Sequence, residues 1–146
     1  MKTSLKLTLY KPSTENSLPL PLFSDPVAAG FPFPAGDHID QKLDLNDYLI
    51  QHPAATFFVR VDGNSMEGAG IFHNDILIVD RSLSPQSRQI VVAVLNGEFT
   101  VKRIKQEGKR LFLMPENPHF PPLEVTEELD FQIWGVVTHT IHRCLP

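Results

Sequence analysis

The chain has 146 residues, of which 42% are apolar and 21% charged, and its formal net charge is −4 at pH 7. These proportions are typical of a globular protein that buries a core without cross-links. The acidic balance argues against general nucleic-acid binding, which usually needs a basic excess. The single cysteine excludes an internal disulfide, and the longest apolar run, residues 90–95, is much shorter than the roughly 20 residues of a membrane-spanning helix. We therefore expect a cytoplasmic protein with one folded domain and an arm.

Prolines mark the first 36 residues, which contain six of the 13 prolines in the chain. Because proline fixes φ and removes a backbone donor, this segment is not expected to form a helix or a central strand. Leu5, Leu7 and Leu9 alternate with polar residues, and this period of two would let the segment pair with a sheet edge. We predict a flexible N-terminal arm over residues 1–36 and a folded body over residues 37–146.

The body begins with a short helix and continues with a β pattern. Leu45, Leu49 and Ile50 have helical spacing, Asp44 is a suitable N-cap, and Pro53 marks the end. Apolar and β-branched residues then predict strands over residues 56–61, 75–80, 89–95, 98–105, 111–114 and 131–141. The dipeptide at 96–97, Asn-Gly, predicts a tight hairpin because both residues tolerate positive φ. The expected fold is mainly β, a compact and strongly twisted β-domain.

Ser65 is the first residue that indicates chemistry. It lies in Gly63-Asn64-Ser65-Met66-Glu67-Gly68, directly after the strand predicted at 56–61. Glycines permit a tight backbone that exposes a side chain and frees N–H groups, and such groups stabilise an oxyanion during acyl transfer. The alternative is an ordinary polar turn, because serine is a common turn residue.

Lys102 is the second such residue. On a strand, Thr100, Lys102 and Ile104 share one face, so the Thr100 hydroxyl lies beside the amine. A lysine is protonated in water and accepts a proton only if burial lowers its pKa. A Ser–Lys pair therefore requires Lys102 to point inward, next to Ser65. The alternative is a solvated lysine on a surface hairpin, which has no such role.

These two positions belong to a longer series of motifs with a recognisable order. The chain resembles the UmuD-type SOS mutagenesis proteins, including the MucA type, within the LexA-like self-cleaving Ser-Lys peptidases. The resemblance runs from about Leu22 to His142. Its motifs are Phe23-Ser24-Asp25, Ala29-Gly30-Phe31-Pro32, His52-Pro53-Ala54-Ala55-Thr56, Gly63-Asn64-Ser65-Met66, Gly70-Ile71, Asp75-Ile76-Leu77-Ile78-Val79-Asp80, Glu98-Phe99-Thr100-Val101-Lys102 and Trp134-Gly135-Val136-Val137.

The resemblance implies a fold of the LexA/signal-peptidase type and a specific reaction. Ser65 would be the nucleophile, Lys102 the general base and Ala29-Gly30 the scissile bond, with Thr100 beside the amine and the backbone near Met66 holding the oxyanion. No metal or cofactor is implied. The resemblance also implies that a RecA filament on single-stranded DNA stimulates the cut. The product would then form a homodimer and partner a UmuC-type Y-family translesion polymerase.

Three other kinds of protein compete with this interpretation of the function. A LexA-type repressor needs a DNA-binding helix-turn-helix before the cleavage site, and the 29 residues before Gly30 are broken by prolines. A signal peptidase also uses serine and lysine, but it needs a membrane attachment. A non-catalytic β interaction module is the third alternative, and it would be favoured if Lys102 were exposed to solvent.

Other side chains give weaker signals. A metal site at His139 and His142 is not expected, because an odd spacing on one strand puts them on opposite faces. His73 suggests a Ser–His pair with Ser65, but no acidic partner stands out. A cluster of basic residues follows the predicted turn at 96–97 and consists of Lys102, Arg103, Lys105, Lys109 and Arg110. This basic cluster is interpreted as a solvated hairpin or, alternatively, as a contact for an acidic partner. Cys144 and Trp134 receive no role beyond packing.

Overall fold

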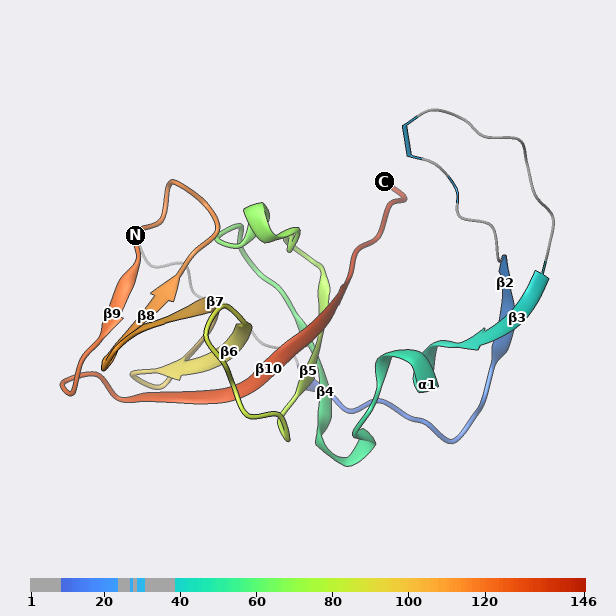
Figure 1. Ribbon diagram of the computed structural model, residues 1–146, viewed down its shortest axis with the longest axis horizontal. Coiled ribbons are helices and arrows are strands. Elements are labelled where there is room, and N and C mark those ends of the chain that lie inside the picture. Colours follow the sequence, from blue (N-terminus) through green and yellow to red (C-terminus); the bar gives the residue numbers. More distant parts are fainter. Residues whose placement is uncertain (1–8, 24–26, 28, 31–38) are drawn as a thin grey trace. The chain divides into compact units, whose positions relative to one another are not determined.

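The computed structural model describes residues 9–23, 27, 29–30 and 39–146 (Figure 1). The chain forms two compact units. The larger contains the first strand and His52–Pro146, and the smaller is Ser13–Gln51. The boundary predicted after residue 36 falls outside the described residues. In the described part of the chain, no helix is long and apolar enough to cross a membrane.

The larger unit is built on an antiparallel sheet, which has eight strands within the described residues. Its order is β1-β4-β5-β10-β6-β7-β8-β9. The strands are β1 (Leu9–Tyr10), β4 (Thr56–Arg60), β5 (Ile76–Asp80), β6 (Ile90–Leu95), β7 (Glu98–Glu107), β8 (Arg110–Met114), β9 (Leu123–Val125) and β10 (Phe131–Ile141). A short 3-10 helix, η1 (Pro53–Ala55), precedes β4. The predicted mainly β fold is therefore confirmed.

The hairpin predicted between β6 and β7 forms at Asn96-Gly97. Both residues have positive φ, 49° and 79°, as a type I′ turn requires. This turn sets the register of the two strands, in which Val91 faces Lys102 and Ala93 faces Thr100. The hairpin sequence therefore places Lys102 in the middle of the sheet.

The buried apolar residues form two clusters, which lie on opposite faces of the sheet. The first contains Val92 and Val101, and the second contains Val91 and Ile104. Successive side chains of β6 alternate between them, because Val92 belongs to one cluster and Val91 and Ala93 belong to the other. All three are fully buried. On β7, Val101 packs in the first cluster and Ile104 in the second. Both faces of the β6–β7 hairpin are therefore covered, so it cannot be a solvated surface hairpin.

β10 joins the two halves of the sheet, lying between β5 and β6 (Figure 1). Its pairing with β6 shifts register between Ile133 and Gly135, and Gly135 is buried. A Cβ atom on Gly135 would stand 2.6 Å from Cγ1 of Val79. The glycine is therefore needed because the backbone of β10 approaches β5 closely here.

Gly135→Ala is expected to lower the free energy of unfolding by about 1–3 kcal/mol, the usual cost of overpacking a core. Chemical denaturation of the two proteins measures this difference. Gln132→Ala, at an exposed position of the same strand, should change the free energy by less than about 0.5 kcal/mol. Equal stability of Gly135→Ala and the unaltered chain would show that β10 shifts to make room.

In its described residues, the smaller unit has a two-stranded ribbon and one α-helix. β2 (Pro19–Phe23) pairs antiparallel with β3 (Ile39–Asp44), and α1 (Leu45–Leu49) follows. The side chain of Asp44 caps the helix as predicted, because its Oδ1 accepts the N–H of Asn46 at 2.9 Å. The prolines of β2 are tolerated because the ribbon has two strands, so one edge of β2 needs no ladder donors. Neither ribbon strand was predicted from the sequence.

Candidate active site

Ser65 lies in the loop that connects β4 to β5. Two backbone hydrogen bonds close the base of this loop: the N–H of Val61 donates to the carbonyl of Asp75, and the N–H of Asn74 donates to the carbonyl of Val61, both at 2.8 Å. Gly63 has a φ of +114°, a conformation that disfavours any side chain. The predicted loop after the strand is therefore present, and its glycine permits the turn before Ser65.

Met66 anchors the same loop in the core. Its side chain is only 2% exposed and packs with Val59, Val61 and Ile71 in the first cluster. The short 3-10 helix η2 (Glu67–Ala69) follows directly. Because Met66 points inward, the loop holds the neighbouring Ser65 at the surface of the core, where it is partly buried.

Lys102 reaches Ser65 from the middle of β7. Its Nζ lies 2.9 Å from Oγ of Ser65, 3.1 Å from Oγ1 of Thr100 and 3.0 Å from the carbonyl oxygen of Val101. The arrangement that the sequence required, with an inward-pointing amine beside the serine and the threonine next to it, is thus present. The contacts come from two separate elements, the β4–β5 loop and β7.

The surroundings of Lys102 make its neutral form easier to reach, and the protonated form still predominates at pH 7. Burial lowers the pKa of Lys102 from 10.5 to about 8, because the protein interior solvates an ammonium poorly. A neutral amine has two N–H groups and one lone pair. The carbonyl of Val101 only accepts, and the Thr100 hydroxyl also accepts, so these two oxygens take the N–H groups. In this neutral form the lone pair is left for the Ser65 hydroxyl, whose Oγ lies 2.9 Å from Nζ, and this is the arrangement that a general base needs.

Two backbone donors near the serine are available to an anion. The N–H groups of Gly68, Ala69 and Gly70 all donate to backbone carbonyls. Among the backbone hydrogen bonds of the described residues, none has the N–H of Ser65 or Met66 as its donor. Unengaged N–H groups beside a nucleophile are suited to stabilise an oxyanion.

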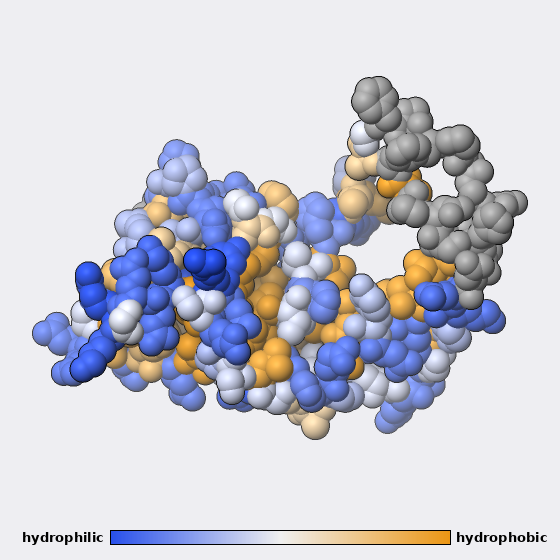
Figure 2. Space-filling view, viewed as in Figure 1, coloured by the Kyte–Doolittle hydropathy of each residue, from blue (hydrophilic) through white to orange (hydrophobic). Residues whose placement is uncertain are grey.

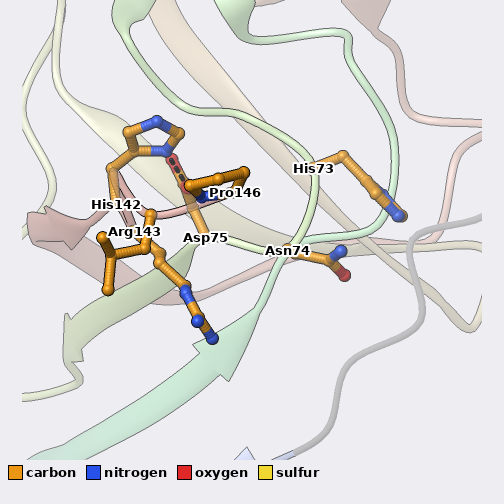
Figure 3. Close-up of a pocket in the computed structure, with 7 residues that line it drawn as sticks. His73, Asn74, Asp75, His142, Arg143 and Pro146 are labelled. Atoms are coloured by element: carbon orange, nitrogen blue, oxygen red, sulfur yellow. Dashed lines mark hydrogen bonds and ion pairs between the residues drawn. The ribbon is translucent and has the colours of Figure 1, made fainter.

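A hollow of about 130 Å³ lies beside Lys102. Its lining mixes apolar and polar side chains and includes Lys102 but not Ser65; it consists of Leu95, Glu98, Phe99, Thr100, Lys102, Leu113 and Leu123. Its four apolar side chains suit contact with an apolar side chain of a bound segment. A larger hollow of about 320 Å³, which Figure 3 shows, is lined by neither Ser65 nor Lys102. The chemistry therefore points to the smaller hollow.

Two buried carboxylates at the ends of β5 were not expected from the sequence. Asp75 is 2% exposed, and its Oδ1 lies 2.6 Å from Nδ1 of His142, as Figure 3 shows. Its Oδ2 also accepts the N–H of Phe72, which ties the Ser65 loop to β5. Asp80 is similarly buried and lies 2.6 Å from Nδ1 of His52. Burial raises the pKa of Asp80, but hydrogen bonds from Ser82 and His52 outweigh it and leave the pKa below its ordinary value.

Among the described residues, no other histidine forms a hydrogen bond with the Ser65 hydroxyl. His73 accepts the N–H of Gly63 at 3.2 Å and lies 3.3 Å from Asp62, an acidic partner that the sequence did not reveal. No hydrogen bond between described residues joins His73 to Ser65. His139 contacts the hydroxyl of Thr138, and the described residues contain no group of three or more metal-ligating side chains.

Three members of the predicted basic cluster form separate ion pairs. Arg103 pairs with Glu116, Lys105 with Glu107, and Arg110 with Glu124. Figure 2 shows a mainly hydrophilic surface over β8 and β9, the strands that carry Arg110 and Glu124. Lys102 itself is partly buried and does not belong to this surface. Trp134 packs against Phe57 and Phe99, and Cys144 is exposed.

The predicted scissile bond lies in the smaller unit, in the connection between β2 and β3. Ala29 and Gly30 form part of a bend, and both are exposed. A Cβ atom built on Gly30 would meet nothing within 4 Å. The bond is thus accessible, and neither residue fills a core position.

The chain matches the peptidase S24-like family over residues 21–138. It is 46% identical over 138 residues to protein ImpA of Salmonella typhimurium, with 90% of each chain covered. It is 50% identical over 123 residues to protein SamA of Salmonella typhimurium strain LT2, covering 84% of this chain and 85% of SamA. Protein MucA of Escherichia coli is 44% identical over 123 residues, with 84% of each chain covered. The resemblance inferred from the motifs is thereby confirmed: the chain belongs to the peptidase S24-like family of self-cleaving serine peptidases, among the UmuD-type SOS mutagenesis proteins.

Proposed function

We propose that this protein cleaves its own backbone once, between Ala29 and Gly30, with Ser65 as nucleophile and Lys102 as general base. The observation that carries the proposal is the 2.9 Å separation between Nζ of Lys102 and Oγ of Ser65 in a partly buried site. A lysine held in this way has a pKa of about 8, near the operating pH of a general base. A non-catalytic β interaction module is less favoured, because it required a solvent-exposed Lys102.

The chemistry follows from the contacts. The neutral amine of Lys102 accepts the proton of Ser65 as Oγ attacks the carbonyl carbon of Ala29. The N–H groups of Ser65 and Met66 stabilise the negative charge on the carbonyl oxygen. The bond to the nitrogen of Gly30 then breaks, and Lys102 donates the proton to that nitrogen. Water finally hydrolyses the ester between Ser65 and Ala29, which releases the new carboxylate.

The residues at the scissile bond suit the site. Alanine and glycine bring little bulk to the reacting carbonyl, and the hollow beside Lys102, of about 130 Å³, has room for one neighbouring side chain. We infer that the small pair is required because the amine must stay shielded from water during the attack.

The biological role follows from the relatives. We propose that contact with a RecA filament on single-stranded DNA promotes the cut, as part of the SOS response. Residues 30–146 would then form a homodimer that partners a UmuC-type Y-family polymerase in translesion synthesis. Membership of the family, with relatives such as ImpA and MucA, supports this role.

Mass spectrometry of the purified chain tests the proposal. We expect two products, residues 1–29 and 30–146, which form faster when a RecA filament assembled on single-stranded DNA is added. Gly30→Val should block both products while preserving the β-rich circular dichroism spectrum, since a branched side chain crowds the reacting carbonyl. A cut at another bond, or an unchanged rate in Gly30→Val, would contradict the assignment of Ala29-Gly30.

A further inference from the structure

The segment just after β8 holds the Ser65 loop by three hydrogen bonds. The N–H of Glu116 donates to the carbonyl of Ser65 at 2.9 Å, and the carbonyl of Glu116 accepts the N–H of Gly68 at 2.7 Å. The side-chain amide of Asn117 donates to the carbonyl of Asn64 at 2.9 Å. These bonds bracket Ser65 on both sides, and we refer to Glu116 and Asn117 together as the clamp.

The approach between the two segments is close enough to exclude a side chain. A Cβ atom on Gly68 would stand 2.6 Å from the carbonyl oxygen of Glu116, a distance at which the backbone has to move. The second glycine of the Ser65 motif is therefore explained by contact with the clamp. Its φ lies outside the left-handed region, so no strained turn demands glycine here.

The side chain of Glu116 connects the clamp to the strand that carries the base. Its Oε1 accepts Nε of Arg103 at 2.5 Å, and Arg103 directly follows Lys102 on β7. Nη1 of Arg103 also donates to the carbonyl of Arg88, so the guanidinium is held at two points. Both members of the Arg103–Glu116 pair are only 33% exposed. A planar guanidinium fixed in this way restricts the carboxylate that it binds.

We propose that Glu116 is a positioning residue for the Ser65–Lys102 pair, because it ties the backbone that carries Ser65 to the strand that carries Lys102. The β4–β5 loop is also closed at its base by backbone hydrogen bonds, such as that from Val61 to Asp75. These bonds lie several residues from Ser65. The clamp, by contrast, binds the backbone of Ser65 itself and of the nearby residues Asn64 and Gly68. The inference rests on the proposed function, since it assigns the contact a purpose in that reaction.

The test compares Glu116→Ala with Glu116→Gln and with a matched control. A misplacement of about 1 Å costs up to about 100-fold in rate, so Glu116→Ala should lower the self-cleavage rate constant by about 10- to 100-fold. Glu116→Gln should retain most of the rate, because its amide oxygen still accepts from Arg103. Glu124→Ala should cleave at the unaltered rate, since the Glu124–Arg110 pair joins β8 and β9 without contacting the Ser65 loop.

Two further readouts separate positioning from other roles. A fluorophosphonate probe reacts with the Ser65 hydroxyl without binding of the arm, and Glu116→Ala should slow this reaction to a similar extent. The pH at half-maximal cleavage should stay unchanged, with only the plateau reduced. A lower midpoint at an unchanged plateau would show that Glu116 acts through its charge on Lys102, which would overturn the proposal. A slower cut with an unchanged probe reaction would also overturn it.

The outcomes distinguish this inference from the proposed function. Cleavage by Ser65→Ala would refute the proposed function, whereas full-rate cleavage by Glu116→Ala beside an inactive Ser65→Ala would refute only the positioning role. If Glu116→Ala does not fold, Asn117→Ala removes the third bond of the clamp without disturbing the Arg103–Glu116 pair. Asn117→Ala should then lower both the cleavage rate and the probe reaction, and unchanged rates in both would overturn the inference.

Discussion

Ser65→Ala is expected to abolish formation of the 1–29 and 30–146 products. The substitution removes Oγ, the atom that lies 2.9 Å from the amine of Lys102 and that would attack Ala29. No other serine of the described residues forms a hydrogen bond with Lys102, whose other contacts are the Thr100 hydroxyl and the Val101 carbonyl. The fold should persist, because the anchoring contacts of the loop come from Met66 and from backbone atoms. Gel analysis over several days and a thermal melt measure the two effects.

Ser87→Ala is the matched control for this experiment. The Ser87 hydroxyl accepts the N–H of Gln106 at 3.0 Å and is exposed, so its loss removes a hydrogen bond without affecting the amine. We expect Ser87→Ala to cleave at the unaltered rate. Continued cutting of Ser65→Ala at Ala29 would mean that a different nucleophile or a separate protease makes the cut.

The strands could be predicted where side-chain alternation and turn residues agree. The β6–β7 hairpin is the clearest case, because Asn96-Gly97 fixes its turn and the apolar residues fix its faces. The ribbon of β2 and β3 was not predicted, since prolines in β2 disfavour a strand and only pairing with β3 stabilises it. β9 was missed because three residues are too few to show a period. Local patterns thus predict strands whose own residues alternate and end in a turn. They do not predict strands that form only because another strand pairs with them.

The residues of the site also differ in whether a local sequence pattern predicts them. Alternation along β7 predicts that Thr100 lies beside Lys102, and the structure has their polar atoms 3.1 Å apart. The clamp has no comparable signal, because two of its three bonds use the backbone of Glu116, and a backbone N–H or carbonyl is present at almost every residue. Asp75 was missed for a different reason: its carboxylate is satisfied by His142, 67 positions away, and such distant partners leave no local pattern.

The rate of self-cleavage is expected to rise with pH and to level off near pH 9. Lys102 acts as a base only when neutral, and burial holds its pKa at about 8. The neutral fraction is then about a tenth at pH 7 and about nine-tenths at pH 9, so the rate constant should increase about tenfold over this range. A lysine with the ordinary pKa of 10.5 would give a rate that still climbs about eightfold between pH 9 and pH 10. The pH at which the rate levels off therefore measures how far burial lowers the pKa of Lys102.

Lys102→Met and Lys105→Met complete this experiment. Lys102→Met should abolish cleavage at every pH, whereas Lys105→Met should keep the full profile, since Lys105 is exposed and pairs with Glu107. Stability gives an independent measure of the same pKa. The pKa of Lys102 is lower in the folded chain than the unfolded value of 10.5, so the unfolded chain binds more protons between about pH 8 and 10.5. Across that window, the unaltered chain should gain stability relative to Lys102→Met as the pH rises. A pH-independent rate from 7 to 10, with no such gain, would mean that Lys102 is not the base.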